Sequence, residues 1–543
     1  MSIVRLENLG RAGILFDLPD YSLPPEAYSY GKNVRFGNEV VCKTAGDSQV
    51  YGNLDANAGP FFLVPWADVI TYSWLYGSGS RVFRHTGSAE TNVTRYTTTP
   101  GDDDYSGGSD PTWSSAIFNG LPVLNVDSFS DPPQSWNTVT NRFQNLPGWP
   151  SSTYCKLISS FGNYLIAADL QESGNRYYYK IRWSSAAPVG ALPSTWTPAA
   201  SNSAGSNPRL GETSDFILDM LSLKNIHCIY KEDHVWGMRW VGGNYVFDVQ
   251  PIFRNFGILA KGCVGEFSEG RSDKRLPKHF VVTKGDVIVH DTNMWQSIAN
   301  KKTKDNIFEV MDQDNSHHSF VVHNERMKEM MFFYPETGNT YCNMCAVWNY
   351  EDNSWGYRDA DQMRCGALGV DTSATAPRVI DDINETIDSQ NYKFDGRTYN
   401  PNEKQVLIGS PTNNELYRVD LTNQFHGNAI NSVLERTGLP IAGNDRFGNP
   451  KIDANSTKFF RGIRPIVEGT IGSEINFYVG VQEQPEGSVD WIGPMTFTIG
   501  TTKWLDFELS GYFFCYQIQD SINGTWKMNG MLIDMDITSR YGE

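Results

Sequence analysis

The sequence predicts an all-β fold, with a β-propeller-like repeat of four-stranded blades and an additional β-sandwich or barrel domain. Aromatic residues make up 13% of the 543 residues, alongside 49 Gly and 27 Pro, which is typical of short strands joined by tight turns. Apolar runs recur along the middle of the chain at spacings close to those of propeller blades. Helical patterns are short, for instance at 213–223, and no long amphipathic helix is expected.

Residues 1–55 are predicted to form an extended N-terminal arm and a hairpin. Pro19 and the Pro24-Pro25 pair disfavour a helix in this region. Residues 33–36 and 39–43 alternate in the manner of half-buried strands, and Gly37-Asn38 between them is a two-residue turn signal. The arm is expected either to lie on a neighbouring chain or to complete the first propeller blade of its own chain.

Residues 56–370 are predicted to form the propeller-like domain with insertions. Repeat units begin at 61, 116, 156, 215, 279 and 319, with spacings of 55, 40, 59, 64 and 40 residues. The shorter spacings match propeller blades, and the Ser/Gly/Pro-rich stretches 97–112 and 184–213 account for longer ones as insertions. A radial array leaves few open sheet edges. A series of β-sandwiches is the competing interpretation.

Two further regions follow the predicted propeller. Residues 371–456 read as a linker with additional strands and loops: 371–403 is polar and acidic, and 404–425 returns to strands. Residues 457–543 are predicted to form a C-terminal β domain. Its last strand alternates apolar and acidic residues, which predicts one buried face and one anionic face. The expected strands are 459–463, 475–481, 504–507, 513–518 and 531–537.

The charge balance and the targeting signals exclude several classes of protein. Lys and Arg number 45 against 62 Asp and Glu, a formal net charge of −17. This argues against wrapping nucleic acid by neutralising phosphates, but not against a surface past which DNA slides. No apolar run approaches the ~18 residues of a membrane span. The N-terminus lacks the apolar core of a secretory signal, so the eight cysteines are expected to be reduced, buried thiols.

No short motif of catalysis or nucleotide binding is present. The sequence lacks a Walker A loop, a His-Glu-x-x-His motif, a Gly-x-Ser-x-Gly elbow and a strand followed by Gly-x-Gly-x-x-Gly. We therefore predict no catalytic, cofactor-binding or metal-binding residues and no cofactor. Paired carboxylates for glycoside hydrolysis need only spatial proximity, and 62 acidic residues offer no basis for choosing two.

Two patterns in the sequence indicate a metal site only weakly. Cys342-x-x-Cys345 has Cys365 and the histidines 317, 318 and 323 nearby, but zinc sites usually need a second pair at defined spacing, so core thiols are favoured. The 102–107 loop, with Asp102, Asp104 and Ser106, matches the first half of an EF-hand loop. Its twelfth position is Trp113 rather than the required Glu, so a solvated acidic loop is favoured.

Four tryptophans lie near predicted strand ends, where sugar-binding proteins place flat aromatic platforms. The alternative, which we favour, is that they are core aromatics that close the blades. They are Trp183, Trp240, Trp295 and Trp355.

The two ends of the chain carry turn and packing motifs that belong together. The opening combines Asn8-Leu9-Gly10-x-x-Gly13-Ile14, Asp17-x-Pro19, Leu23-Pro24-Pro25-x-Ala27-Tyr28-Ser29, Asn33-Val34-Arg35-Phe36 and Val41-x-Lys43-x-x-Gly46. The closing combines residues 511–518 (GYFFCYQI), 524–531 (GTWKMNGM) and 533–536 (IDMD). Together they resemble the tail nozzle family, also called tail tubular protein B or tail hub, of short-tailed bacteriophages (podoviruses). The motifs are structural and carry no active site.

The resemblance implies a virion structural protein and no enzyme. Six copies would form a homohexameric tube, the tail nozzle, below a portal-adaptor ring of the tail tubular protein A type. The tube would be a conduit and gate for ejection of double-stranded DNA, which it would not bind specifically. Tail fibres or spikes would attach near the adaptor. The protein would be made in the host bacterial cytoplasm, reside in the phage tail and not insert into a membrane.

The gate residues are unknown from the sequence. The Gly-, Asn- and Pro-rich stretch 426–456 is a candidate tip loop, with an ordinary surface loop as the alternative. The alternative function is a carbohydrate-binding or polysaccharide-degrading β-propeller tail protein. A scaffold propeller for protein partners outside a virion is a third interpretation, and the terminal motifs count against it.

Overall fold

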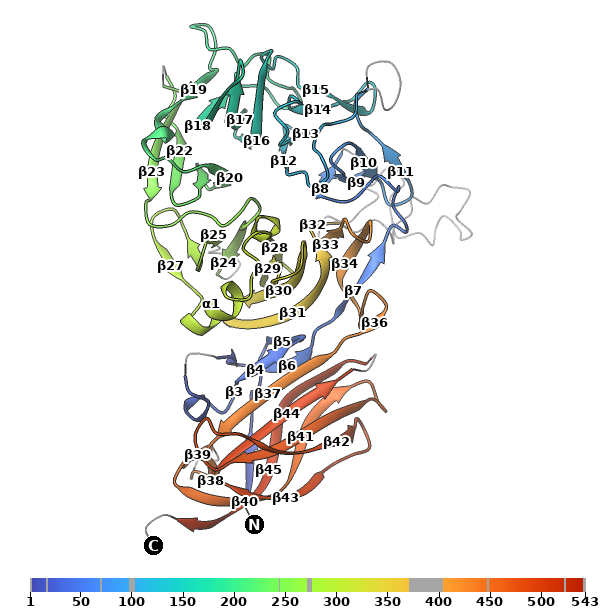
Figure 1. The fold of residues 1–543 in the computed structure, drawn as a ribbon, viewed down its shortest axis with the longest axis vertical. Helices are drawn as coiled ribbons and strands as arrows, with labels where there is room; N and C mark the ends of the chain where they lie inside the picture. The colour runs from blue at the N-terminus through green and yellow to red at the C-terminus, as the bar shows by residue number, and fades with distance from the viewer. Residues whose placement is uncertain are drawn as a thin grey trace, which may run out of the picture.

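The chain folds into a ring of β-sheets and a β-sandwich that lies beside the ring (Figure 1). The computed structural model describes residues 2–15, 18–68, 71–96, 103–243, 245–270, 276–370, 404–446, 449–521 and 524–540. Within these residues, seven four-stranded antiparallel sheets make up the ring, and two larger antiparallel sheets make up the sandwich. This confirms the predicted propeller-like repeat of four-stranded blades. The described strands form no closed barrel.

The first three blades follow one another in the chain, each with its strands in sequence order. Their strands are β8 (Phe62–Ala67), β9 (Tyr72–Gly77), β10 (Val82–His85), β11 (Glu90–Asn92), β12 (Trp113–Phe118), β13 (Leu121–Val126), β14 (Gln134–Asn137), β15 (Arg142–Asn145), β16 (Thr153–Phe161), β17 (Tyr164–Glu172), β18 (Asn175–Trp183) and β19 (Gly205–Asn207).

The next three blades repeat the pattern, with the one α-helix of the described residues, α1 (Lys301–Phe308), between the fifth and sixth. The strands are β20 (Ile217–Leu223), β21 (Ile226–Lys231), β22 (Val235–Trp240), β23 (Phe247–Phe253), β24 (Val264–Glu269), β25 (Leu276–Val282), β26 (Val287–His290), β27 (Trp295–Ser297), β28 (Phe320–Asn324), β29 (Glu329–Tyr334), β30 (Cys342–Asn349) and β31 (Ser354–Met363). Three 3-10 turns lie at η1 (Asp20–Ser22), η2 (Arg209–Glu212) and η3 (Ser316–His318).

The seventh blade closes the ring with a strand from the start of the chain. It consists of β32 (Cys365–Val370), β33 (Lys404–Ser410), β34 (Glu415–Thr422) and then β7 (Gly46–Val50), whose Val50 pairs with Leu416. First strands of most neighbouring blades contact one another, including β32 against β8, and β20 contacts β25 of the fifth blade, so these strands form the inner wall of the ring. The N-terminal segment thus completes the last blade of its own chain, not the first.

The sandwich combines both ends of the chain. Its six-stranded sheet has the order β43 (Leu505–Gly511), β40 (Ser456–Gly469), β45 (Trp526–Arg540), β6 (Val40–Lys43), β5 (Val34–Gly37), with β1 (Ser2–Leu6) also paired to β45. Its five-stranded sheet has the order β4 (Tyr30–Lys32), β37 (Ser432–Leu439), β44 (Phe513–Asp520), β41 (Glu474–Gln482), β42 (Asp490–Thr498). Three two-stranded pairs complete the fold: β2 (Gly13–Ile14) with β3 (Ala27–Tyr28), β35 (Gln424–Phe425) with β36 (Asn428–Ala429), and β38 (Ile441–Asn444) with β39 (Pro450–Ile452).

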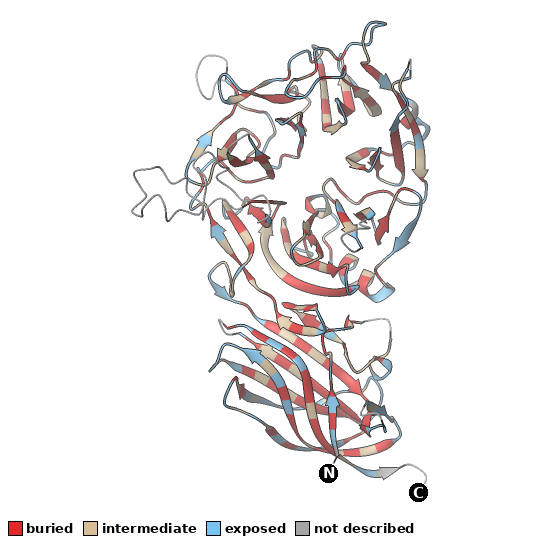
Figure 2. Ribbon diagram, turned by 180° about the vertical axis from the view of Figure 1, so that it is seen from behind, coloured by how far each residue is buried: buried red, intermediate tan, exposed pale blue. Residues whose placement is uncertain are grey.

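Alternating side chains build the sandwich core from both sheets. Figure 2 shows buried and more exposed residues taking turns along its strands. Phe460, Phe514 and Ile533 are fully buried and belong to one continuous apolar cluster that extends to the β5–β6 hairpin and the nearest blades. Because that cluster crosses from sandwich to ring, the two units share part of one hydrophobic core.

The structure corrects several boundaries that the sequence predicted. The sequence assigned residues 404–422 to the linker region and β7 to the arm. Both belong to the seventh blade, because β34 pairs with β33 on one side and with β7 on the other. The fifth blade begins at β24, not at 279, since its first strand is less apolar than β25. Residues 217–223 form a strand rather than a helix because β21 pairs with them. The predicted linker 371–403 lies outside the described residues.

Two other features complete the comparison with the expected elements. The predicted hairpin is present, but its turn lies at Asn38 and Glu39 and not at Gly37-Asn38, because Gly37 pairs with Val40 as the last residue of β5; Asn38 and Glu39 both have positive φ. Most of the candidate tip loop 426–456 consists of strands β36 to β39. Among the described residues, no helix has the length and apolar character needed to cross a membrane.

Candidate functional site

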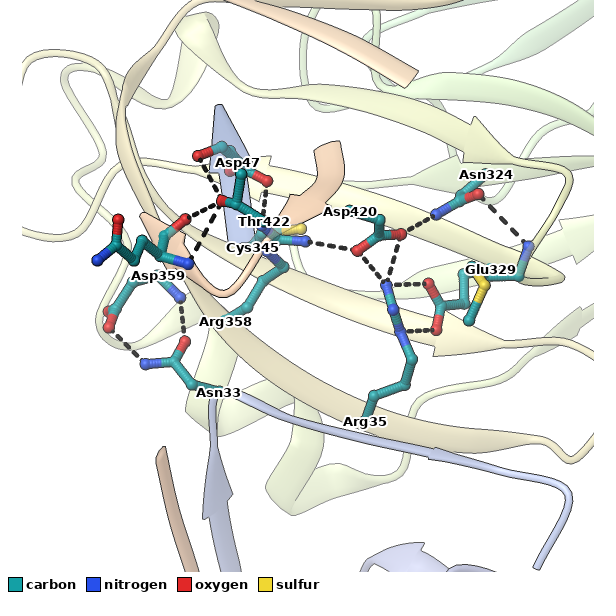
Figure 3. A network of polar contacts seen from close by, with 12 residues as sticks. Asn33, Arg35, Asp47, Asn324, Glu329, Cys345, Arg358, Asp359, Asp420 and Thr422 are labelled. Carbon is teal, nitrogen blue, oxygen red and sulfur yellow. Dashed lines mark hydrogen bonds and ion pairs between the residues drawn. The ribbon is translucent and has the colours of Figure 1, made fainter. Parts of the chain in front are cut away.

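A buried network of charged side chains joins the sandwich to the ring (Figure 3). Arg35, on β5 of the sandwich, lies between two carboxylates of the ring. Its Nε is 2.7 Å from Oε1 of Glu329 on β29, and its Nη2 donates to both oxygens of Asp420 on β34 at 3.0 Å. Arg35 therefore connects the sandwich to the sixth and seventh blades at once.

A second arginine connects the closing strand to the sixth blade. Arg358, on β31, donates from Nη2 to Oδ1 of Asp47 on β7 at 2.6 Å, and both side chains are almost fully buried. Its Nη1 lies 3.7 Å from Oδ1 of Asp420. The strand that closes the ring is thus held by backbone pairing with β34 and by a buried ion pair with the neighbouring blade.

Asn33 fixes the hairpin beside these charges. Its side-chain amide donates to Oδ2 of Asp359 at 2.7 Å, and the backbone N–H of Asp359 returns a bond to Oδ1 of Asn33 at 2.8 Å. The backbone N–H of Asn33 donates to the carbonyl of Tyr357 at 2.8 Å. Asn33 has a φ of 57°, a left-handed conformation that Asn tolerates better than most residues.

Burial and pairing oppose each other in the pKa values of the three carboxylates. Burial raises the pKa of Glu329, against the effect of Arg35, and raises that of Asp47, against the effect of Arg358. Burial also disfavours the charged form of Asp420, but Arg35 and Arg358 together lower its pKa below the ordinary value. Both arginines have a raised pKa because neighbouring carboxylates outweigh their burial. Such a network stabilises a fixed geometry.

This network has no room for a substrate. The cavity beside Arg35, Glu329 and Arg358 measures about 10 Å³, roughly the space of one water molecule. Glycoside hydrolysis needs two carboxylates on either side of a sugar in an open cleft. The carboxylates at the junction do not have that arrangement; their contacts are ion pairs with Arg35 and Arg358.

A second cluster of polar side chains lies at one end of the ring. A cavity of about 150 Å³ there is lined by the beginnings of first strands from several blades, and by His317 and Arg364. Asp110 precedes β12, and its Oδ2 lies 2.8 Å from Nε2 of His318 and 3.3 Å from Nε2 of His317. Hydrogen bonds from the two histidines lower the pKa of Asp110.

The cysteines of the Cys-x-x-Cys pair lie in an apolar core and outside this polar cluster. Cys342 and Cys345 pack with β33 and β34, and burial raises the pKa of both thiols. Cys342 donates to the carbonyl of His318 at 3.3 Å, and Cys365 donates to the carbonyl of Pro60 at 3.1 Å. These contacts are those of core thiols.

The acidic loop that resembles half of an EF-hand is held by arginine. Asp104 accepts from Nε of Arg81 at 3.1 Å, and the backbone of Ser106 donates to Asp131 at 2.8 Å. Trp113 is buried. Asp102 lies outside the described residues.

The four tryptophans divide into two pairs. Trp183 and Trp355 are buried, and their indole N–H groups donate to the carbonyls of Ser203 and Ile298. Trp240 and Trp295 are exposed, by 64% and 44%. The core interpretation therefore fits two of the four.

Sequence reasoning missed the cluster of Asp110, His317 and His318. Its acid and its histidines are about 200 residues apart, and loops before two different blades bring them together. The adjacent histidine pair was its one sequence signal. No family model matches this sequence, and no curated protein matches it either.

Proposed function

We propose that this chain is a structural subunit of the tail nozzle of a short-tailed bacteriophage, with no enzymatic activity. Six copies would form a tube below the portal-adaptor ring, with the sandwich in the tube wall and the propeller at its periphery. DNA would leave the capsid through the channel between the copies. Fibres or spikes would attach near the adaptor.

The observation that carries this proposal is that the two resembling ends fold into one unit. β1 pairs with β45 in a continuous register from Ser2 with Met535 to Leu6 with Met531. The β5–β6 hairpin extends the same sheet through Lys527 and Cys42. The motifs at the two ends therefore belong to one folded domain, which supports a shared architecture rather than two separate local matches.

The motif glycines occupy positions where a side chain does not fit. A Cβ on Gly10 would lie 2.0 Å from the backbone carbon of Val40, and one on Gly46 would lie 1.9 Å from the carbonyl oxygen of Gln424. A Cβ on Gly511 would lie 2.7 Å from Cβ of Val481. Since real Cβ contacts are longer than this, close packing requires glycine at these positions, within the sandwich at Gly10 and Gly511 and in the closing strand of the seventh blade at Gly46.

The sandwich presents an open sheet edge that suits assembly. β42 has a partner on one side only, and its Trp491 and Ile492 are exposed by 38% and 42%. An exposed, apolar edge strand pairs readily with another chain. In the proposed tube, this edge would meet a neighbouring copy.

The charge of the last strand needs a more limited interpretation than the sequence suggested. Asp534 and Asp536 both ion-pair with Arg461, at 2.7 Å and 2.6 Å. These carboxylates therefore do not form a bare anionic face. Repulsion of DNA in the proposed channel would come from the net charge of −17 of the whole chain.

Cryo-electron microscopy of the particle that contains this chain tests the proposal. The expected result is a six-fold tube with an axial channel beneath a larger ring, with sandwiches in the wall. A trimeric spike, or a lone propeller on the particle surface, would refute it. The purified chain alone is a weaker test because assembly of a nozzle depends on its adaptor.

A groove on the rim of the ring favours carbohydrate binding as a second candidate function. It measures about 1130 Å³ between the outer strands of the third and fourth blades, and Asn202, Tyr245 and Asp248 line it. Tyr245 is 82% exposed, and aromatic faces beside amide and carboxylate groups are suited to sugars. A glycan array with the wild-type chain and Tyr245→Ala tests this function. Equal signals from both would exclude the groove.

A further inference from the structure

The cluster of Asp110, His317 and His318 connects two blades that are not neighbours. Asp110 lies in the segment that leads into β12 of the second blade, and the histidines lie in η3, which leads into β28 of the sixth. The seventh and first blades separate them on the shorter side of the ring. The contact therefore crosses the end of the ring where the first strands begin.

The hydrogen bonds of the two histidines determine which ring nitrogens carry protons. Nδ1 of His318 lies 2.6 Å from the carbonyl oxygen of Thr340, and Nδ1 of His317 lies 3.0 Å from that of Asp314. A carbonyl only accepts, so each Nδ1 carries the proton. In the neutral imidazoles, both Nε2 atoms then present lone pairs to the same carboxylate oxygen of Asp110.

Three acceptor atoms that face one another repel unless a cation lies between them or the imidazoles donate hydrogen bonds to the carboxylate. A histidine whose Nδ1 donates to a backbone carbonyl while its Nε2 points at a shared centre has the arrangement of a metal ligand. Metal–ligand bonds of about 2.0–2.1 Å at a tetrahedral angle place ligand atoms about 3.4 Å apart. The 3.3 Å from Asp110 Oδ2 to His317 Nε2 fits this spacing, and the 2.8 Å from the same oxygen to His318 Nε2 is shorter, so ion binding would move His318 and Asp110 slightly apart. The three ligand atoms lie within 4.8 Å of one another.

Arg364 orients the carboxylate. Its Nε lies 3.9 Å from Oδ1 of Asp110, is buried, and has no hydrogen-bond partner. This places the guanidinium on the side of Oδ1 and leaves Oδ2 toward the imidazoles. The ring of Tyr341 covers His318 at 5.0 Å, while His317 remains half exposed, so one side is open to water as a fourth ligand.

We propose that Asp110, His317 and His318 bind one divalent transition-metal ion of the zinc type. The ion would crosslink the second blade to the sixth. Two imidazoles and one carboxylate are a donor set that suits Zn²⁺ and disfavours Mg²⁺ and Ca²⁺, which prefer oxygen ligands alone. This proposed metal site does not depend on the proposed function in the virion.

The test is calorimetric titration of the EDTA-stripped, dialysed full chain with Zn²⁺ near pH 7.5. We expect one ion per chain, a higher melting temperature with Zn²⁺ than in EDTA, and visible absorption bands of tetrahedral Co²⁺ when Co²⁺ is the probe. His317→Ala removes a half-exposed ligand and is expected to fold. It should weaken the affinity at least about 100-fold, more than loss of an outer-shell partner. Asp110→Asn should act in the same direction.

The matched control is His234→Ala. His234 also contacts a carboxylate, with Nδ1 3.0 Å from Oδ2 of Asp215, but no second histidine converges there. This variant should keep the affinity and the stoichiometry of the wild type. The proposal is overturned if the wild type binds no stoichiometric Zn²⁺, or if His317→Ala binds it as tightly as His234→Ala does. Either result would leave a doubly protonated ion pair as the state of the cluster.

Discussion

Replacing Arg35 with Met tests whether the charged junction holds the two units together. The change removes the one cation that lies between Glu329 and Asp420 and leaves a side chain of similar length. Removing one partner of a buried ion pair typically costs about 3–5 kcal/mol. Because Arg35 contacts two carboxylates, and Glu329 is almost fully buried, we expect a loss of unfolding free energy toward the upper end of that range.

The loss should depend on pH in a defined direction. Burial already raises the pKa of Glu329, and without Arg35 it rises further above its value in the unfolded chain. A carboxyl with a raised folded pKa destabilises the fold above its unfolded pKa of about 4.3, and this penalty disappears as the pH falls. The difference between wild type and Arg35→Met should therefore be largest near pH 7 and shrink toward pH 4.

Urea unfolding followed by tryptophan fluorescence measures the effect. The loss of unfolding free energy is the change in the urea midpoint multiplied by the dependence of the free energy on urea concentration. Arg5→Met is the matched control, because Arg5 and Glu7 form an exposed ion pair, and it should change stability by less than about 0.5 kcal/mol. Adding Glu329→Met to Arg35→Met should recover part of the loss, since it removes the unpaired charge. A loss below about 1 kcal/mol, or one that grows in acid, would refute the reasoning.

Three further substitutions test other parts of the fold. Trp355→Ala should lower stability by about 3–5 kcal/mol, since the ring is buried and its indole donates to Ile298; an unchanged melting temperature contradicts this placement. Cys345→Ser should keep the wild-type oligomeric state and metal content in native mass spectrometry, because the thiol is a core group; a lost stoichiometric metal would overturn that assignment. Gly46→Val should cost about 3 kcal/mol, the upper end of the usual range for overpacking, and expose β7 to hydrogen exchange, because its Cβ would collide with Gln424; wild-type protection of β7 would contradict closure of the ring by this strand.

Local pattern was sufficient for most of the blades. The run Phe320–Val322 of β28 is apolar, and the segment from residue 33 to residue 43 alternates around a turn signal, so a blade strand and a hairpin were predicted at these places. β7 was not recognised as a blade strand. Its Asp47 is buried, which a pattern of apolar residues does not anticipate, and only the ion pair with Arg358 makes that burial tolerable.

The two polar clusters depend on contacts that sequence spacing does not encode. Arg35 and Glu329 are far apart in the sequence, and charged residues of these types usually lie on the surface. They form a buried ion pair because the β5–β6 hairpin packs against the sixth blade. Asp110 meets His317 and His318 only after the ring has closed. By contrast, the Cys342–Cys345 pair was assigned correctly to the core by its apolar surroundings, which are local.

Strands near the N-terminus pair with strands made much later, so parts of the fold form only late in synthesis on the ribosome. β7 cannot pair with β34 until Leu416, the partner of Val50, has been synthesised. β1 cannot pair with β45 until Met535, the partner of Ser2, has been synthesised. At ~5–20 residues per second, the nascent β7 remains without its partner for roughly 20 to 75 s. A chain that terminates before β34 therefore carries neither a closed ring nor a complete sandwich, and one that terminates between β34 and β45 still lacks the strand that pairs with β1.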